Sequence, residues 1–499
     1  MGAAAPLFLA VDLGAESGRA MAGRVGDGGI VLEELHRFAN VPVRLTDRLA
    51  WDVETLLAEV RAGIDAAPEA VSVAVDGWGV DVVLLDAGGT PCAPPRCYRD
   101  PITAGILPHV FERIPRAALF ARTGIQMMEI NTLGQLVAMA RAGAPDLDGA
   151  ARMLLMPDYL QHRLGADAVS ERTNASTTQM LAHDGTWATD VLDACGLPSH
   201  LCAPIVQPGT VVGSVRGRPG MDIVAAGSHD TASAVAGTPL PRDVPAAFIS
   251  SGTWSLVGME LRAPVLGDIA LRCNLSNEHG VAATVRLLRN VMGLWLVQQL
   301  RSAFATRDGD AADYATLLHE AEQSPPFVSV VDPDDPAFLR PGDLPAAIAE
   351  ACVRTGEPKP EGRGALVRAV IESLALRYRW AVDALSLATG VRPAVIHVVG
   401  GGSRNALLNR CTADATGLPV VAGPVEATAA GNVAVQAIAR GVLGSLEDAR
   451  TLIARGAGLR RYDPDPGAAP RWEEAYARFC ALPGVGTPGA EAPAALQRA

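Results

Sequence analysis

Residues 7–25, LFLAVDLGAESGRAMAGRV, decide the expected fold of this chain. An apolar run is followed by a turn of small residues and then by a second run, which predicts a strand–turn–strand unit. Residues 246–261, AAFISSGTWSLVGMEL, repeat the pattern around a turn of serine, glycine and threonine. Residues 237–245, GTPLPRDVP, are expected to link the two halves. We therefore predict a duplicated pair of domains.

Strands and helices alternate along the chain. Residues 71–89 predict a strand, a turn and a further strand, and residues 394–405 predict a buried strand that ends in three glycines. The helical spacing of residues 406–417 ends at Gly417, which predicts a helix C-cap. Residues 418–424 then predict a strand, and 426–441 a helix of small residues. This alternation indicates an α/β protein with helices on both faces of its sheets.

The sequence also supports structural predictions for two further segments. Residues 283–300 are predicted to form a helix, because Leu287, Val291 and Leu294 fall on one helical face. The segment after about residue 483 is rich in proline, glycine and alanine, and we expect it to be disordered.

Composition narrows the function classes. The net charge of −12 argues against binding along a nucleic-acid backbone, although it allows a local site for a small anion. The N-terminus lacks a basic region and meets Asp12 too early for a signal peptide. No uncharged apolar run reaches the length of a membrane span. A soluble, cytoplasmic protein is expected.

Cysteine and lysine usage excludes several chemistries. None of the eight cysteines forms a C-x-x-C pair or has zinc-site spacing, so free thiols are expected. Lys359, in a Pro/Gly-rich stretch, is the single lysine of the sequence. The chain therefore has no P-loop lysine and no strand lysine of the protein-kinase type.

Three turns have the character of phosphate-binding loops, because small residues expose backbone N–H groups. They are Gly14 to Gly18 after the first strand, Gly252 and Thr253 in the second half, and Gly400 to Gly402 between a strand and a helix. Each could instead be an ordinary hairpin turn or a helix cap. Asp230, in GSHDTAS (227–233), could cap a helix that starts at Thr231, or it could be a catalytic base. Together the four features fit one nucleotide cleft.

These motifs resemble those of the FGGY family of carbohydrate kinases from about residue 7 to about residue 465. The segments that carry the resemblance are AVDLGAESGR (10–19), DGWGVDVVLLD (76–86), YRD (98–100), MPDYLQHRL (156–164), TNASTTQ (173–179), SHDTASAV (228–235), SSGTWSLVG (250–258), RNVMGLWLVQ (289–298), VVGGGSRN (398–405) and GPVEATAAGN (423–432). The resemblance implies two actin-like, ribonuclease-H-like domains with ATP and sugar in the cleft between them. Residues 1–240 would form the first domain and 241–465 the second, with a C-terminal helix and tail at 466–499.

The resemblance also implies roles for single residues, carried over by motif. Asp230 corresponds to the catalytic base, and Asp12 to the acid that faces Mg²⁺. Glu16 departs from the small hydroxyl residue of several relatives, and we expect it to point away from the phosphates or to bind the metal. The ATP positions are Ala15, Glu16, Ser17, Gly18, Arg19, Thr253, Gln298 and Gly401, and the sugar positions are Gly79, His229, Asp230, Thr231 and Asn290.

Within the family, the segments 173–179, 228–235 and 289–298 resemble those of kinases for the ketose L-rhamnulose. That implies phosphorylation of its 1-hydroxyl group, with Trp78 either as an apolar wall for the sugar methyl or as a core residue. A kinase for another ketose, such as L-fuculose, is the nearest alternative. An actin-like or Hsp70-like ATPase, or a sugar-sensing protein without catalysis, shares the same cleft. A ribokinase-type enzyme is disfavoured, because its G-A-G-D segment is absent. We expect a monomer or homodimer.

Overall fold

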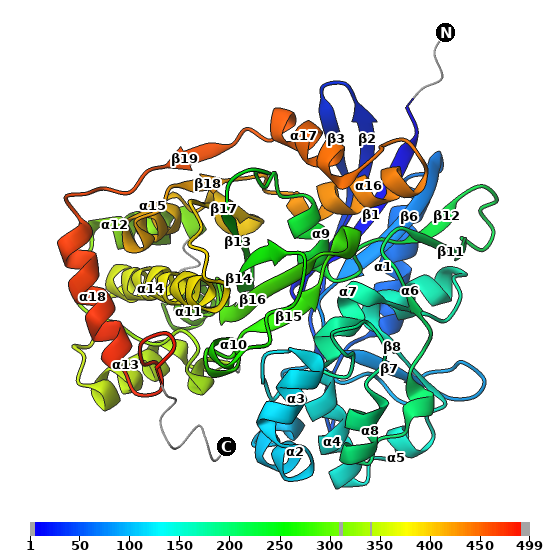
Figure 1. Ribbon diagram of the computed structural model, residues 1–499, viewed down its shortest axis with the longest axis horizontal. Coiled ribbons are helices and arrows are strands. Elements are labelled where there is room, and N and C mark those ends of the chain that lie inside the picture. The colour runs from blue at the N-terminus through cyan, green and yellow to red at the C-terminus, as the bar shows by residue number, and fades with distance from the viewer. Residues whose placement is uncertain (1–4, 309–312, 340–341, 491–499) are drawn as a thin grey trace.

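The computed structural model describes residues 5–308, 313–339 and 342–490 of the chain. Figure 1 shows its helices and strands. Within these residues, most strands belong to two mixed sheets of six and seven strands. Every strand of the six-stranded sheet precedes residue 226, and every strand of the seven-stranded sheet follows residue 245. The expected α/β fold with two similar halves is confirmed.

The six-stranded sheet is built around its first strand. β1 pairs antiparallel with β2, which pairs antiparallel with β3, and on its other side β1 pairs in parallel with β6. The sheet continues from β6 to a parallel β12 and an antiparallel β11. The bounds are β1 (Leu7–Leu13), β2 (Ser17–Gly26), β3 (Gly29–Ala39), β6 (Ala70–Gly77), β11 (Thr210–Ser214) and β12 (Asp222–Ala225).

β1 is buried on both faces, which explains why its sequence is an unbroken apolar run ending in one acid. Leu9 and Val11 pack with residues of α1 (Val53–Asp65). Phe8 and Ala10 point the opposite way and pack with residues of α16 (Ala427–Ala439). Successive side chains of a strand alternate between faces, so this helix–sheet–helix layering follows directly from the sequence.

The seven-stranded sheet repeats this plan. β13 pairs antiparallel with β14, β14 with β16, and β13 also pairs in parallel with β17, which is followed by a parallel β18. β15 and β19 complete the two edges in antiparallel orientation. The bounds are β13 (Ala246–Ser251), β14 (Trp254–Leu261), β15 (Ser276–His279), β16 (Val285–Met292), β17 (Val395–Val399), β18 (Val420–Ala422) and β19 (Arg460–Tyr462).

The predicted helix over residues 283–300 is wrong in its first half. Residues Val285–Met292 form β16, and α11 (Trp295–Asp308) begins only afterwards. β16 lies between β14 and β15, and most of its side chains are buried on both faces. A strand buried on both faces has no polar side to reveal a period of two, so its apolar residues also fit a helical pattern.

Helices cover the second sheet and fill the space around both sheets. The long helix α14 (Arg363–Thr389) contributes Ile371 and Leu374 to the same core as Val257 of β14 and Val291 of β16. α15 (Ala406–Thr416) ends at Gly417 in left-handed conformation, as predicted. The other α-helices are α2 (Leu107–Arg113), α3 (Arg116–Thr123), α4 (Thr132–Ala142), α5 (Pro145–Asp148), α6 (Met156–Leu164), α7 (Arg172–Ala175), α8 (Thr189–Cys195), α9 (Asp230–Ala236), α10 (Asp268–Arg272), α12 (Tyr314–Gln323), α13 (Leu344–Thr355), α17 (Leu446–Gly456) and α18 (Ala469–Ala481).

Short elements lie outside the two large sheets. The predicted strand after residue 80 exists, but it pairs with a neighbouring short strand and not with β6. The small strand pairs are β4 (Val43–Arg44) with β5 (Leu49–Ala50), β7 (Val82–Leu85) with β8 (Arg152–Leu155), and β9 (Ser170–Glu171) with β10 (Ile205–Val206).

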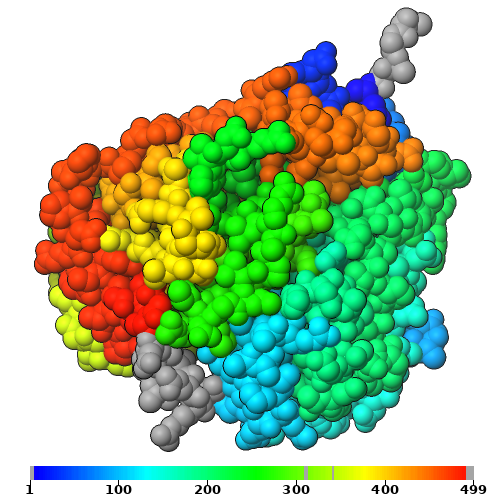
Figure 2. Space-filling view, viewed as in Figure 1, coloured from blue at the N-terminus to red at the C-terminus, as the bar shows by residue number. Residues whose placement is uncertain are grey.

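The C-terminal half returns to the first sheet. Figure 2 shows the orange surface of α16 and α17 beside the blue N-terminal strands. Gln436 of α16 donates to the Leu9 carbonyl at 3.0 Å and accepts from the Ser72 hydroxyl at 2.6 Å. A Cβ atom on Gly431 would lie 1.8 Å from the Ser233 carbonyl oxygen, so glycine permits the close packing of α16 on α9. Through these contacts α16, a helix of the second half, packs on the first half.

The C-terminal end is partly described. Trp380 Nε1 donates to the carbonyl oxygen of Gly486 at 2.9 Å, which ties residues after α18 to α14. Of the tail expected to be disordered, residues 491–499 lie outside the described residues. No helix of the described part is long and apolar enough to cross a membrane. All eight cysteines carry free thiols.

Candidate active site

A cavity of about 260 Å³ opens where the ends of strands from both sheets meet. The turn after β1, the turn after β13, the glycines after β17 and the start of α9 all contribute to its wall. The chain thus brings together the four features that were singled out in the sequence. The predicted site residues that line the cavity are Asp12, Ala15, Ser17, Arg19, Gly79, His229, Asp230, Thr231, Thr253, Asn290 and Gly401.

Asp230 is the first residue of α9, and His229 occupies the N-cap position without a capping hydrogen bond. Asp230 is therefore not the helix cap that one interpretation of the sequence allowed. Its Oδ1 atom accepts from the Thr231 hydroxyl at 3.1 Å and lies 3.4 Å from Nε2 of His229. Burial raises the pKa of Asp230, His229 opposes that rise, and the charge of Asp12 adds to it. The group is thus a carboxylate with increased basicity at the wall of a cavity.

Two more acids lie at the ends of neighbouring strands. Asp12 on β1 is opposite Asp76 on β6 in the parallel register. Asp12 accepts from Arg19 at 2.6 Å, and Arg19 also forms an ion pair with Glu426, next to α16. These two ion pairs hold the guanidinium of Arg19 beside the turn that follows β1.

Asp76 is a residue that the sequence analysis did not select. It is fully buried, and burial together with Asp12 raises its pKa well above the usual value. Its Oδ2 accepts from Asn432 of α16 at 2.5 Å, whereas its buried Oδ1 has no hydrogen-bond partner among the described residues. A sequence signal was present, since Asp76 is the second-last residue of a buried strand, as Asp12 is of β1.

The two glycine-containing turns face open space. A Cβ atom on Gly401 would meet nothing within 4 Å, and one on Gly252 would meet only the Trp254 carbonyl, at 3.8 Å. By contrast, a Cβ on Gly402 would lie 2.0 Å from the Ser251 hydroxyl, because this turn packs on the turn after β13. The two turns therefore form one backbone-lined wall that a flat ring or a phosphate chain could approach closely.

Three predicted ATP positions do not line the cavity. Glu16 is partly buried, and burial raises its pKa while the charge of Arg99 opposes the rise. Gly18 packs on Phe38, since a Cβ there would lie 2.2 Å from the ring. Gln298 lies on α11 with its Oε1 buried and without a hydrogen-bond partner in the described chain. Glu16 thus lies away from the cavity wall, as its charge suggested.

The other end of the cavity combines amides with apolar side chains. Asn290 of β16 donates its backbone N–H and its side-chain amide to Gln126 Oε1, at 2.8 and 3.2 Å. The apolar residues that line this end are Trp78, Ile125, Met128 and Ile130. Gln126, Ile125, Met128 and Ile130 were not predicted from the sequence, because the segment that contains them has no recognisable motif.

Trp78 lines the cavity and also belongs to the core. It is 6% exposed, its ring centroid lies 4.4 Å from that of Trp51, and its Nε1 donates to Asp81 at 3.0 Å. Asp81 also accepts from Trp51 Nε1 at 2.6 Å and from the backbone of Tyr98 at 3.1 Å. Burial raises the pKa of Asp81 to about 6 despite these donors. The indole of Trp78 is therefore held rigidly, with one side toward the cavity.

Comparison with known proteins identifies the family. The model of the N-terminal domain of the FGGY family of carbohydrate kinases matches residues 7–237, and that of the C-terminal domain matches residues 247–440. The chain belongs to this family.

Relatives at higher identity are rhamnulokinases. That of Bacteroides thetaiotaomicron is 42% identical over 486 residues, which is 95% of this chain and 98% of the relative. That of Pectobacterium atrosepticum is 41% identical over 469 residues, covering 92% of this chain and 93% of the relative. Solved structures with the same fold include the xylulose kinase of Lactobacillus acidophilus, with a TM-score of 0.78 at 15% identity over 95% and 97% of the two chains. The gluconate kinase of the same organism has a TM-score of 0.77 at 16% identity over 96% and 97%.

Proposed function

We propose that this carbohydrate kinase transfers the γ-phosphoryl group of ATP to the 1-hydroxyl of L-rhamnulose, giving L-rhamnulose 1-phosphate and ADP. The observation that carries this proposal is the roughly 40% identity to rhamnulokinases along almost the whole chain. The cavity supports it, because its wall combines two phosphate-type turns, a carboxylate and a polar sugar-sized end.

Asp230 is the proposed base. In the transfer, a bond forms between O1 of the sugar and the γ-phosphorus, and the bond from that phosphorus to the β–γ bridging oxygen breaks. The hydroxyl proton passes to Asp230, whose raised pKa makes it a better acceptor than an ordinary aspartate. Base catalysis of this kind contributes roughly 10²- to 10⁴-fold. The remainder comes from positioning and from stabilising the phosphoryl charge.

Backbone groups and Arg19 are the proposed nucleotide contacts. The turn Gly14–Ser17 and the turn at Gly252 and Thr253 both line the cavity, although the N–H groups of Gly14 and Gly252 are already bonded within their turns. Gly401 leaves space for the adenosine. No lysine is needed, because oriented N–H groups and a guanidinium can hold phosphate oxygens. Gln298 Oε1, buried and without a partner among the described groups, is available to a nucleotide that reaches α11.

The residues present fit a magnesium ion that arrives with ATP. The described residues contain no group of three or more His, Cys, Asp or Glu side chains arranged to hold a metal. Mg²⁺ commonly uses one or two carboxylates together with phosphates and water, and Asp12, which lines the cavity, could supply a hard oxygen of that kind. When bound, the ion neutralises charge on the β- and γ-phosphates. Arg19 holds Asp12 in its present orientation.

Sugar selectivity is assigned to the polar end of the cavity. Thr231 and Asn290 can each pair with a hydroxyl, so an isomer with one inverted hydroxyl would leave a buried partner unpaired. His229 lines the same cavity. The rigid indole of Trp78, together with Ile130, offers an apolar surface for the terminal methyl of a 6-deoxy ketose. We assign the sugar side and the first phosphate turn to residues 1–240, and the ATP side to residues 241–465, in a cytoplasmic enzyme.

The proposed function is tested by ADP release in a coupled assay with purified protein, ATP, Mg²⁺ and L-rhamnulose. We expect ADP release that requires the ketose and a product whose phosphate is on C1, identified by ³¹P–¹H NMR correlation. ATP hydrolysis that does not depend on any ketose would instead indicate an ATPase. Ketose binding without turnover would indicate a sensor.

A further inference from the structure

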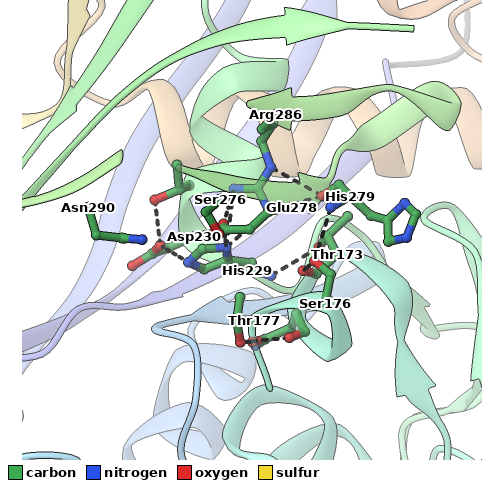
Figure 3. Close-up of polar contacts among 12 residues, drawn as sticks. Thr173, Ser176, Thr177, His229, Asp230, Ser276, Glu278, His279, Arg286 and Asn290 are labelled. Carbon is green, nitrogen blue, oxygen red and sulfur yellow. Dashed lines mark hydrogen bonds and ion pairs between the residues drawn. The ribbon is translucent and has the colours of Figure 1, made fainter. Parts of the chain in front are cut away.

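A buried ion pair lies against His229, the residue that precedes the proposed base (Figure 3). Arg286 of β16 is fully buried, and its NH1 lies 3.3 Å from Oε2 of Glu278 on β15. Burial favours the protonated form of Glu278, but the charge of Arg286 opposes that effect, and the pKa of Glu278 lies at about 2. The pair is therefore ionised. Neither residue belongs to a motif recognised in the sequence.

The pair contacts His229 through one ring nitrogen. Arg286 NH1 and NH2 lie 3.2 and 3.1 Å from Nδ1 of His229. A guanidinium has donors only, so Nδ1 must present its lone pair. Glu278 Oε2 lies 3.4 Å from the same nitrogen, but it has no hydrogen-bond partner among the described residues. Contact of Arg286 with Nδ1 favours the tautomer of His229 that carries its proton on Nε2.

The Nε2 atom is the one that faces Asp230. Its distance to Oδ1 is 3.4 Å, and Thr231 donates to the same oxygen at 3.1 Å. Oδ1 therefore accepts the hydrogen bond of the Thr231 hydroxyl and lies beside Nε2 of His229. Within the described part of the chain Oδ2 receives no donor, so it is the oxygen left for a substrate proton. A reversed tautomer would place a lone pair of Nε2 against the carboxylate and would repel it.

The contact also joins the two sheets. Arg286 and Glu278 belong to adjacent strands of the seven-stranded sheet. His229 is the N-cap residue of α9 and forms a bridge with Gly77 at the end of β6 in the six-stranded sheet. The orientation of the imidazole therefore depends on how the second sheet is placed against the first.

We propose that Arg286, neutralised by Glu278, is a positioning residue that sets the tautomer of His229 and thereby orients the catalytic carboxylate of Asp230. The inference rests on the proposed kinase function. It goes beyond that function because it assigns catalytic importance to Arg286, which does not line the cavity, and to Glu278, which lines the cavity and is the counter-ion of Arg286. It also makes the orientation of the base a property of both sheets together.

The test is a double-mutant cycle measured as kcat with the ketose substrate, using Arg286→Met, His229→Gln and the double variant. Loss of an outer partner of this kind commonly costs about 10- to 100-fold in activity. We expect Arg286→Met to lower kcat by that amount with an unchanged KM for ATP. If Arg286 acts through His229, the double variant loses no more than His229→Gln alone, which is the signature of coupling. Arg286→Lys, which retains a donor, should recover part of the activity.

Arg289→Met is the matched control. Arg289 lies on the same strand and pairs with Asp334 at 3.3 Å, but it makes no contact with His229. We expect its kcat to stay within about threefold of the wild type, even if its melting temperature falls as far as that of Arg286→Met. If Arg286→Met does not fold, Glu278→Gln/Arg286→Met removes both charges and takes its place in the cycle.

Additive losses in the cycle, or an equal loss of kcat in the control, would overturn the inference while leaving the kinase function intact. Failure of the proposed function is distinct from this, because the wild-type protein itself would then release no ADP with any ketose.

Discussion

Nε2 of His229 lies 3.4 Å from Oδ1 of Asp230, at the point where a helix of the first half meets a strand of the second. The carboxylate is therefore oriented by its own sequence neighbour, and that neighbour is oriented by Arg286 on the other sheet. Because residues of both halves orient the base, proton transfer depends on how the two halves are arranged around the cleft.

Replacing Asp230 by asparagine keeps the shape of the side chain and removes the proton acceptor. We expect kcat to fall by roughly 10²-fold or more. Because burial raises the pKa of Asp230, ionisation of this group at neutral pH opposes folding, so the variant should melt no lower than the wild type at pH 7. Binding of ATP, measured by calorimetry, should be nearly unchanged.

The control for this variant is Asp268→Asn. Asp268 is also the first residue of its helix, α10, but it is exposed and outside the cavity. It should keep wild-type activity. Wild-type turnover by Asp230→Asn would remove Asp230 from the role of base.

The raised pKa of Asp230 also predicts the pH profile. The base must be ionised to accept a proton, so kcat/KM should rise with pH through the pKa of the free enzyme. Burial is the main cause of the upward shift, opposed by His229 and reinforced by Asp12. The midpoint of the acid limb should therefore lie above about 3.9, the value of an ordinary aspartate. An acid limb at or below that value would contradict the electrostatic description of the site.

Filling the space at Gly401 should block the nucleotide. A Cβ atom there meets nothing within 4 Å and points into open space at the cavity wall. We expect Gly401→Val to raise the KM for ATP by at least tenfold and to leave the melting temperature unchanged.

Gly267→Val is the matched control, since a Cβ on Gly267 also meets nothing within 4 Å, but this residue lies outside the cavity. Its KM for ATP should equal that of the wild type. If Gly401→Val and Gly267→Val had similar KM values for ATP, we would conclude that the nucleotide binds elsewhere.

Glu278→Gln should show a pH-dependent loss of stability. The pKa of Glu278 in the folded protein is about 2, below its ordinary value of 4.5, so its ionic contribution is fully present above pH 4.5 and is lost as the pH falls toward 2. Removing one partner of a buried pair commonly costs about 3–5 kcal/mol. In urea unfolding at pH 7 the variant should be less stable by about that amount.

The difference in the free energy of unfolding between Glu278→Gln and the wild type should become smaller by about 1 kcal/mol when the pH is lowered to 3.5. Glu69→Gln serves as the control, because Glu69 is exposed and its ion pair with Arg24 lies at the surface. An unchanging difference across this pH range would show that Glu278 is not held ionised by Arg286.

Much of the fold could be predicted because local patterns and tertiary structure agree. The run of residues 7–13 could only be a strand buried on both faces, and Gly417 ends its helix in the conformation that glycine favours. For residues 285–292 the same reasoning predicted a helix, and that prediction was wrong. Their strand is covered on both faces, and the apolar spacing that remains fits a helix equally well. Only its pairing with β14 and β15 decides its structure.

The candidate site could be predicted where chemistry is concentrated in one short segment, as in the turns at Gly14 and Gly252 and in the segment around Asp230. Arg286 and Glu278 could not be found this way, since they lie about 50 residues from the base in sequence and meet it only through strand pairing. An arginine within the apolar run VRLLRNVM was the one available signal. A buried charge in a strand requires a partner, and the partner was not visible from the sequence.

The central claim is the identity of the phosphoryl acceptor. It is tested most directly by kcat/KM measured from initial rates at low concentrations of L-rhamnulose, L-fuculose, L-ribulose, D-xylulose and glycerol, at fixed saturating ATP and Mg²⁺. A site built to pair with each hydroxyl rejects isomers that leave a buried group unpaired. We predict the highest kcat/KM for L-rhamnulose, with 1-phosphate as the product. A higher kcat/KM for any of the other four would contradict the assigned substrate.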